Sequence, residues 1–332
     1  MQYRLYKLAF DAPVRFGADI RGASLERTSM TCHADTLFSA LCTEAAAREG
    51  GEGAARLIES ARDGHLLFSD LFPYRGEDLY LPRPVLPPMF RDESSRESPL
   101  SVQEGMARRK EMKKLAYLPV AQYGRYLTWL AKGGDFNLAS QSFGESQLAQ
   151  RVNRRSEPPL PYMVGAFSFQ QDAGLYFISA ARDSTLFDQV DDLVDSLGHA
   201  GIGGKRSAGY GKFHLSEDPI SMDSEGVYPD DAALYAMLTE TRPDYHMALS
   251  VVLPAAAEAP VVARGWYTLT LRSGFVNSAA YAENAVKRHS IHMLNAGSCL
   301  PSPIEGQVVD VAAGGGHPVC RYGRGLYAGL KL

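Results

Sequence analysis

Residues 201–213 read GIGGKRSAGYGKF and combine the residue types that can hold a phosphate group. The five glycines of this segment interrupt a helix or a strand, and they let the backbone lie close to a partner. The side chains of Lys205, Arg206 and Lys212 supply positive charge, and the hydroxyls of Ser207 and Tyr210 can donate hydrogen bonds. These groups suit a phosphodiester backbone. The alternative is a solvent-exposed glycine-rich turn without a ligand.

Three known nucleotide-binding motifs do not fit this segment. A Walker loop needs a glycine five positions before Gly204, where His199 stands, and a Ser or Thr in place of Arg206. A dinucleotide fingerprint that starts at Gly201 needs a glycine where Arg206 stands. The RNA-recognition signature matches only in GYG, residues 209–211. The pattern therefore predicts a loop between a helix and a strand that lies outside these motif classes.

The elements around this loop are predicted from hydrophobic periodicity. Residues 3–10 alternate between apolar and other side chains, which favours a strand. Residues 33–51 predict a helix in which Asp35 caps the first amide groups and Gly50 or Gly51 ends the helix. Residues 184–198 carry apolar side chains at helical spacing, and Gly198 is expected to end this second helix.

Three further segments have their own signals. VGAFSF and LYFISA, within residues 164–180, flank QQDAG and predict a β-hairpin. Residues 68–90 hold five prolines and several aromatic rings, which predict an ordered, extended loop. The apolar side chains of that loop, Phe72 and Tyr74 among them, are expected to contact partner proteins. Dense charge between residues 91 and 150 predicts an insertion.

Composition limits the class of protein. The chain of 332 residues is long enough for two domains, and its composition, 45 % hydrophobic and 22 % charged, predicts a folded protein. Its net charge of −4 means that basic groups must be concentrated locally if it binds nucleic acid. Four cysteines without zinc or disulfide spacing favour a reducing cytoplasm, and no metal site, signal peptide or membrane span is predicted. His289 and His292, in a predicted helix, lack further ligands nearby.

The segment 201–213 resembles the glycine-rich loop of the RAMP superfamily, the repeat-associated proteins of CRISPR effector complexes. Four more stretches resemble the subunit-four family of the type III-A Csm complex. They are LYKLAFDAPVRFG at 5–17, HADTLFSALC at 33–42, SDLFPY with YLPRP at 69–84, and HPVCRYGRGL at 317–326. These pieces occur in the family's order along most of the chain.

The resemblance implies an α+β fold of tandem ferredoxin-like (RRM-like, βαββαβ) domains. The first would span residues 1–215, with the insertion at about 91–150 and the loop at 201–213, and the second residues 216–332. The resemblance also implies a prokaryotic, cytoplasmic subunit without catalysis or cofactor, which grips the repeat-derived 5′ handle of the guide RNA (crRNA). Its neighbours would be the large polymerase/cyclase subunit and a backbone RAMP subunit of the Csm filament.

The family's RNA-gripping role carries over to the matching residues of the loop, which are Gly201, Gly203, Gly204, Lys205, Arg206, Ser207, Tyr210, Gly211 and Lys212. Arg154 and Arg155 in RVNRRS form a second candidate, although this doubled arginine departs from the family pattern. Arg321 and Arg324 are either solvated charges or contacts to RNA or to another subunit.

His33 leaves an enzymatic alternative open. It lies just before the first predicted helix, where metal-independent RAMP ribonucleases that process repeat RNA can carry a catalytic histidine, and it could act as general acid or base. Otherwise His33 belongs to the start of the helix, where it packs or contacts RNA. A scaffold that does not bind nucleic acid is a third possibility, but it would leave the glycine-rich loop unexplained.

Overall fold

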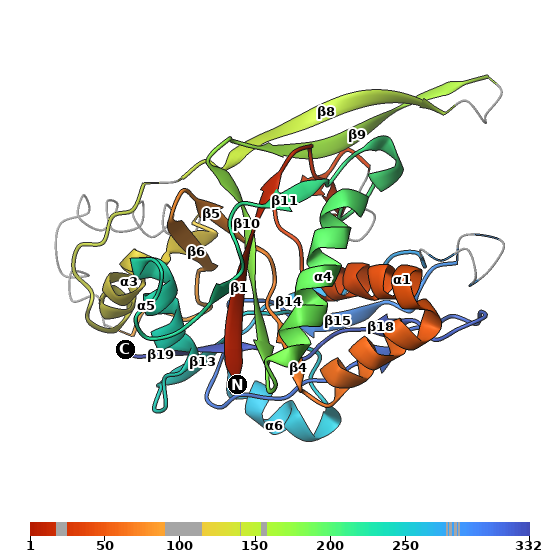
Figure 1. Cartoon of the computed structure of the whole chain (residues 1–332). Helices are drawn as coiled ribbons and strands as arrows, with labels where there is room; N and C mark the ends of the chain where they lie inside the picture. The colour runs from red at the N-terminus through yellow and green to blue at the C-terminus, as the bar shows by residue number, and fades with distance from the viewer. Residues whose placement is uncertain are drawn as a thin grey trace.

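Two long strands, β1 (Gln2–Phe10) and β10 (Ala173–Ala181), form the centre of the largest sheet in the computed structural model (Figure 1). The structure describes residues 1–17, 25–89, 115–139, 141–153, 158–276, 278, 281, 284 and 286–332. β1 and β10 are antiparallel, with Gln2 opposite Ala181 and Leu8 opposite Leu175. The expected strand at residues 3–10 is thus confirmed as β1.

The strand order of this sheet is β11-β1-β10-β5-β6-β7, with β12 also paired to β1 and β4 also paired to β10. The outer strands are short: β4 (Leu66–Phe68), β5 (Phe72–Arg75), β6 (Asp78–Pro82), β7 (Tyr117–Pro119), β11 (Phe213–Leu215) and β12 (Ile220–Ser221). All of these pairings are antiparallel. The fold is therefore mixed α/β with an antiparallel main sheet.

Helices cover both faces of the main sheet. Strand side chains alternate between the two faces, so β1 presents apolar side chains to helices on both sides. Tyr6 and Leu8 pack in one core with the helices α1 (Ala34–Arg62) and α4 (Thr185–Ala200). Leu5 packs in the opposite core with α3 (Val120–Lys132) and α5 (Pro229–Leu238). Figure 1 shows α1 and α4 on one side of β1 and α3 and α5 on the other.

The start of α1 differs from the predicted cap. His33 is the N-cap residue, and the Asp70 carboxylate accepts the Ala34 amide hydrogen bond at 2.8 Å. Asp35 lies in the first turn, and its buried carboxylate pairs with arginine side chains instead. The prediction that Asp35 caps the helix is therefore wrong. The expected end at Gly50 is a kink, where φ is 71°, and the helix continues to Arg62.

The second predicted helix is confirmed as α4, which buries Phe187 and Val190. It ends at Ala200 with Gly201 as C-cap, two residues later than the expected end at Gly198. Gly198 lies instead inside the helix, against the next strand. A Cβ atom built there would lie 2.6 Å from the Phe213 carbonyl oxygen. This glycine therefore permits close helix–strand packing.

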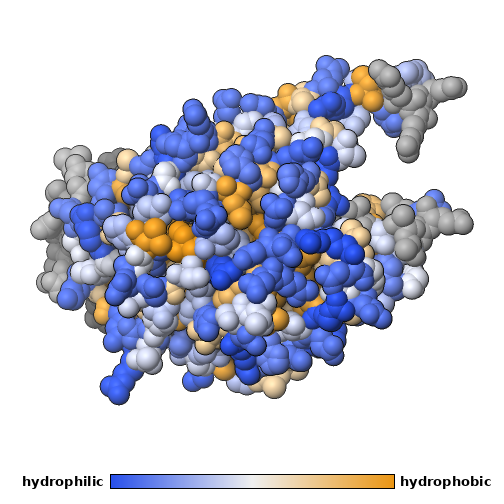
Figure 2. Space-filling model, in the orientation of Figure 1, coloured by the Kyte–Doolittle hydropathy of each residue, from blue (hydrophilic) through white to orange (hydrophobic). Residues whose placement is uncertain are grey.

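The predicted hairpin is wrong in its pairing. β9 (Leu160–Phe169) pairs along its whole length with β8 (Gly144–Asn153), not with β10. Both edges of β10 are already filled, one by β1 and the other by β4 and β5. The β8–β9 ribbon projects from the body of the molecule, as Figures 1 and 2 show.

The extended loop predicted at residues 68–90 is largely part of the main sheet. This segment includes the end of β4 and the whole of β5 and β6. Phe72 is 2 % exposed and Tyr74 is 5 % exposed, so these side chains belong to the core. The prediction that they form a partner surface is wrong, because both side chains are buried within the protein itself. Of the predicted insertion, residues 90–114 lie outside the described part, and α3 occupies residues 120–132.

From residue 245 on, the chain forms smaller antiparallel sheets. β13 (Tyr245–Ala248) lies between β16 (Cys299–Leu300) and β19 (Tyr327–Leu330). Two further pairs are β14 (Leu269–Arg272) with β15 (Ile291–Leu294), and β17 (Val309–Asp310) with β18 (Cys320–Arg321). The helix expected around His292 is thus strand β15.

The two cores of the main sheet also contain residues from the C-terminal part, among them Met247 and Tyr322. The Tyr322 hydroxyl accepts the Phe68 amide hydrogen bond at 2.8 Å, which ties the last strands to β4. The division into two domains at residue 215 stays a prediction. Among the described residues, no helix is long and apolar enough to span a membrane.

Candidate nucleic-acid interface

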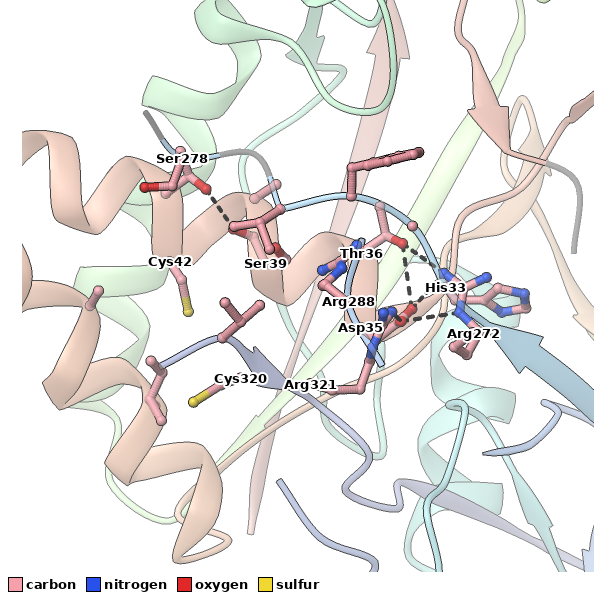
Figure 3. Close-up of a pocket in the computed structure, with 18 of the residues that line it drawn as sticks. His33, Asp35, Thr36, Ser39, Cys42, Arg272, Ser278, Arg288, Cys320 and Arg321 are labelled. Atoms are coloured by element: carbon pink, nitrogen blue, oxygen red, sulfur yellow. Dashed lines mark hydrogen bonds and ion pairs between the residues drawn. The ribbon is translucent and has the colours of Figure 1, made fainter. Parts of the chain in front are cut away.

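A cleft of about 1370 Å³ lies between α1, the glycine-rich loop and segments from the C-terminal part of the chain. Its described lining includes two carboxylates, of Asp35 and Glu59, and six arginines: Arg15, Arg62, Arg206, Arg272, Arg288 and Arg321. The whole chain carries a net charge of −4, so this excess of positive charge is local. A cationic cleft of this kind attracts polyanions. Figure 3 shows part of its lining.

The glycine-rich loop, residues 201–213, leaves α4 and enters β11, in the order predicted. It is fastened to the segment that follows β1. The Gly204 amide donates to the Arg15 carbonyl at 2.8 Å, and the Gly211 amide donates to the Pro13 carbonyl at 3.0 Å. A Cβ atom at Gly203, where φ is +92°, would lie 2.7 Å from the Arg15 carbonyl oxygen. Packing against its own chain thus explains why this position is a glycine.

The basic side chains of the loop have different surroundings. Lys205 is the one non-glycine residue with positive φ, at 64°, in the described part of the chain. Its ammonium group lies 3.2 Å from the Tyr162 hydroxyl and 5.0 Å from the centre of that ring, on β9. Arg206 lines the cleft with one guanidinium nitrogen 3.9 Å from a Glu44 carboxylate oxygen. Lys212 is exposed.

The two predicted hydroxyl donors also differ. Ser207 is exposed, whereas Tyr210 is 8 % exposed and its hydroxyl accepts a hydrogen bond from Arg151 on β8 at 3.2 Å. The Arg151 guanidinium lies 5.8 Å from the centre of the Tyr210 ring. Gly201 and Gly211 are buried. The loop is therefore joined to the β8–β9 ribbon through Tyr210 and Lys205.

His33 lines the same cleft as Gly203, Gly204 and Arg206. Its Nδ1 lies 2.6 Å from the Asp70 Oδ2. The other oxygen of Asp70 accepts amide hydrogen bonds from Ala34 and from Val251, at 2.8 and 3.0 Å. Asp70 thus orients His33, caps α1 and holds the C-terminal part of the chain. The sequence reasoning missed Asp70, since its partners lie far away along the chain.

Arg321 is brought into the cleft lining, but it is 2 % exposed and forms an ion pair with Asp35. Arg272 forms two hydrogen bonds to the same carboxylate, at 3.0 and 2.9 Å. Burial by itself raises the pKa of Asp35, but the two arginines outweigh this effect and hold the pKa well below its usual range. Asp35 is therefore a buried carboxylate anion, and no local pattern identified Arg272 as its partner.

Arg324 is not among the residues that line the cleft. The Arg324 guanidinium donates to the Gly306 carbonyl at 2.9 Å and lies 3.4 Å from Glu305. Arg154 and Arg155 lie outside the described residues. Within the described part of the chain, no group of three His, Cys, Asp or Glu side chains could hold a metal ion.

Comparisons with known proteins agree on one family. Residues 241–330 match the family model of the CRISPR Csm4 C-terminal domain. The chain is 32 % identical to Csm4 of Mycobacterium tuberculosis strain H37Rv, over 99 % of this chain and 98 % of that protein. It is 29 % identical to Csm4 of Streptococcus thermophilus, over the full length of both chains.

Solved structures give the same result at the level of the fold. The chain is similar to one from the Csm3–Csm4 subcomplex of the type III-A CRISPR-Cas interference complex, with a TM-score of 0.66, 16 % identity and full coverage of both chains. A chain of the Csm1–Csm4 cassette in complex with cA4 gives a TM-score of 0.61 at 18 % identity, covering 100 % of this chain and 99 % of that one. Sequence and fold together show that this chain belongs to the Csm4 family, a subunit of the type III-A CRISPR Csm complex.

Proposed function

We propose that this chain is the non-catalytic subunit that holds the 5′ repeat-derived handle of the crRNA in the cationic cleft. The observation that carries the proposal is the excess of arginines over carboxylates in the cleft, in a chain of net negative charge. RNA phosphates are held by such groups, and their neutralisation dominates affinity. Gly203, Gly204 and Arg206 line the cleft on one side and His33 lies near the start of α1.

The residues of the glycine-rich loop would contribute to RNA binding in different ways. Arg206 reaches the cleft directly, while Lys205 and Lys212 extend the positive charge toward the β8–β9 ribbon and the solvent. Ser207, which is exposed, can donate its hydroxyl to a phosphate oxygen. Gly201 and Gly211 shape the loop from within, since a Cβ atom at Gly211 would lie 2.0 Å from the Ile202 carbonyl oxygen.

The proposal includes a ferredoxin-like N-terminal unit as the support of the loop. β1, α1, β4, β10, α4 and β11 follow one another in a βαββαβ order, interrupted by further strands and α3. In the main sheet, β11 and β10 flank β1, and β4 pairs with β10. This arrangement supports the first of the two predicted ferredoxin-like domains. The second, at residues 216–332, is proposed on the family resemblance.

The chain would also dock the large polymerase/cyclase subunit onto a backbone RAMP subunit. The similar solved chains come from a Csm1–Csm4 cassette and from a Csm3–Csm4 subcomplex, so relatives of this fold assemble with both kinds of subunit. The contact surface is not Phe72 or Tyr74, which are core residues. Docking through other surfaces can be tested by pull-down of each subunit with this chain.

The decisive experiment measures binding of a guide RNA with its 5′ handle by fluorescence anisotropy over a salt series. We expect Lys205→Ala/Arg206→Ala to weaken binding and to lower the slope of log affinity against log salt by about 1.4, at roughly 0.7 per lost single-strand phosphate contact. The matched control is Arg125→Ala/Lys132→Ala, which removes the same charge from the exposed face of α3. An unchanged slope in the loop variant would refute the phosphate role of these side chains.

The ribonuclease alternative is tested by measuring cleavage of repeat RNA in the same samples. The contact of His33 with the Asp70 carboxylate is what a general base would need, which is the observation that favours this alternative. The competing explanation is that Asp70 holds His33 as part of the helix cap. We expect no cleavage of repeat RNA with or without divalent metal. Specific scission that disappears in His33→Ala while binding persists would establish the enzyme instead.

A further inference from the structure

Three arginines from separate segments of the C-terminal part converge on one carboxylate. Arg272 ends β14, Arg288 precedes β15 and Arg321 ends β18, and all three line the cleft beside Asp35 in the first turn of α1. Figure 3 shows the three side chains gathered around Asp35. Asp35 carries one negative charge, whereas the three guanidinium groups carry three positive charges.

Several donors of this arginine cluster lack a partner. One terminal nitrogen of Arg321 pairs with Asp35, whereas its Nε and Nη2 are buried and have no hydrogen-bond partner within the described residues. The Nε of Arg288 is in the same state. Buried polar groups in proteins are nearly always satisfied, and a charged donor left unsatisfied costs free energy. Arg321 is 2 % exposed, so bulk water does not explain its unused donors.

The surroundings of Arg288 also disfavour its positive charge. Burial and the neighbouring Arg321 lower the pKa of Arg288 to about 10; Arg272 adds to this effect and Asp35 opposes it. Arg288 therefore stays protonated at neutral pH although its surroundings disfavour the charge. Concentrated positive charge of this kind is destabilising unless an anion completes the site.

We propose that Arg288, which is half-buried and lines the cleft beside Asp35, Arg272 and Arg321, binds one phosphate of the phosphodiester backbone of the guide RNA. This inference rests on the proposed function and names a second contact in the same cleft, made by the C-terminal part of the chain and not by the glycine-rich loop. A guanidinium group matches phosphate oxygens with paired donors, and the buried charges of Arg272 and Arg321 nearby add to the attraction for an anion at Arg288.

A neighbouring aromatic ring favours a nucleotide over a free anion. Phe275 lines the same cleft and is 60 % exposed, so its ring is accessible to a ligand there. It lies three residues after Arg272, and it forms an isolated bridge with Lys287, the residue before Arg288. Unstacked RNA bases bind on exposed aromatic rings while their phosphates meet basic side chains. The arginine cluster and Phe275 together supply both kinds of contact.

Arg288→Gln tests this site without removing the partners of Asp35, because Arg272 and Arg321 both remain. We expect the full-length variant to fold with unchanged or higher Tm, to bind the handle roughly tenfold or more weakly, and to lose about 0.7 from the salt slope. Arg288→Lys keeps the charge and should restore the slope but only part of the affinity. Arg264→Gln, an equal charge change at an exposed residue shortly after the helix α6 (Ala259–Val262), is the matched control.

Guides with a single methylphosphonate linkage locate the contact. One linkage in the handle should weaken binding to the unmodified protein, and Arg288→Gln should lose nothing further at that linkage. Wild-type affinity and slope in Arg288→Gln would overturn the inference while leaving the proposed function intact. The inference would also be overturned if inorganic phosphate raised the Tm of the wild type but not of Arg288→Gln, while the two proteins bound RNA equally well. If the unmodified chain does not bind the handle, the proposed function fails as well.

Discussion

The glycine-rich loop and the arginine cluster lie in the linings of one cleft, yet they place positive charge by opposite means. The loop takes its charges from 13 adjacent positions and leaves Lys212 exposed and Arg206 half-buried. The arginine cluster takes its charges from residues 272, 288 and 321 and buries Arg321 against Asp35. A contiguous motif can thus shape a surface, whereas buried charge needs a counterion that only the folded chain supplies.

The two regions therefore couple differently to stability. Exposed loop charges interact with water and contribute little to folding. The arginine cluster joins the start of α1 to β14 and β18, so it fastens the first helix to the C-terminal strands. Substitutions in the loop should alter binding more than stability, and substitutions at Asp35 should do the reverse.

The largest effect is expected for Asp35→Asn. This change removes the shared counterion of Arg272 and Arg321, and loss of one partner from a buried ion pair costs about 3–5 kcal/mol. Urea unfolding at pH 7 measures this loss. The loop variant Lys205→Ala/Arg206→Ala should change the free energy of unfolding by about 0.5 kcal/mol or less. Similar losses in both proteins would remove the contrast between the two regions.

The pH dependence of the same variant gives an independent check. The pKa of Asp35 is lowered in the folded protein, so its stabilisation is fully present above the unfolded pKa of about 3.9 and is lost as the pH falls below that value. Asn imitates the protonated side chain. The stability difference between the wild type and Asp35→Asn should therefore shrink below about pH 4, and a constant difference would show that Asp35 is not an anion in the folded state.

Local signals account for what the sequence predicted correctly. The alternation of β1, the apolar face of α4 and the place of the loop between α4 and β11 depend on residues close together in the chain. The segment 164–180 was misread because the partners of β10, which are β1, β4 and β5, come from much earlier in the sequence. Hydrophobic alternation identifies a strand but does not specify its neighbour.

The site shows the same limit more strongly. The residue types of the loop predicted a cationic surface, and the structure places Gly203, Gly204 and Arg206 in the cleft lining. Asp35 has the residue type and position of a helix cap. Its actual partner Arg272 lies 237 positions away, so no local pattern reveals the ion pair. Neither Arg272 nor Arg288 belongs to any local pattern, and both were missed. Sequence reasoning thus identified His33, Arg206 and Arg321 of the cleft lining, but not the distant residues that surround them.

A moderate effect is expected for Gly203→Val. Gly203 has φ of +92°, and a Cβ atom there would lie 2.7 Å from the Arg15 carbonyl oxygen. We expect a loss of about 1–3 kcal/mol in unfolding free energy, with RNA binding reduced because the loop shifts. Gly204→Ala is the control, since a Cβ atom there would lie 3.1 Å from the end of the Arg15 side chain and 3.5 Å from the Arg15 carbonyl oxygen, an ordinary contact distance. Equal losses of stability in both variants would mean that the anchoring to Arg15 is not what requires Gly203.

The smallest and most discriminating effect on stability is expected at Lys205. This residue has φ of 64° and ψ of 25°, a left-handed conformation that glycine adopts at lower cost than lysine does. Lys205→Gly should leave the free energy of unfolding unchanged or raise it by up to about 1 kcal/mol, because relief of the backbone opposes loss of the contact with Tyr162.

The RNA affinity of Lys205→Gly should nevertheless fall, with about 0.7 lost from the salt slope. Lys205→Asn, which tolerates the same backbone, should show the same loss of binding. This combination of results would show that the side chain of Lys205 serves binding rather than stability. If Lys205→Gly instead lowers stability and keeps the salt slope, Lys205 serves to fasten the loop to Tyr162, and the charge of the loop that meets RNA is supplied by Arg206 and Lys212.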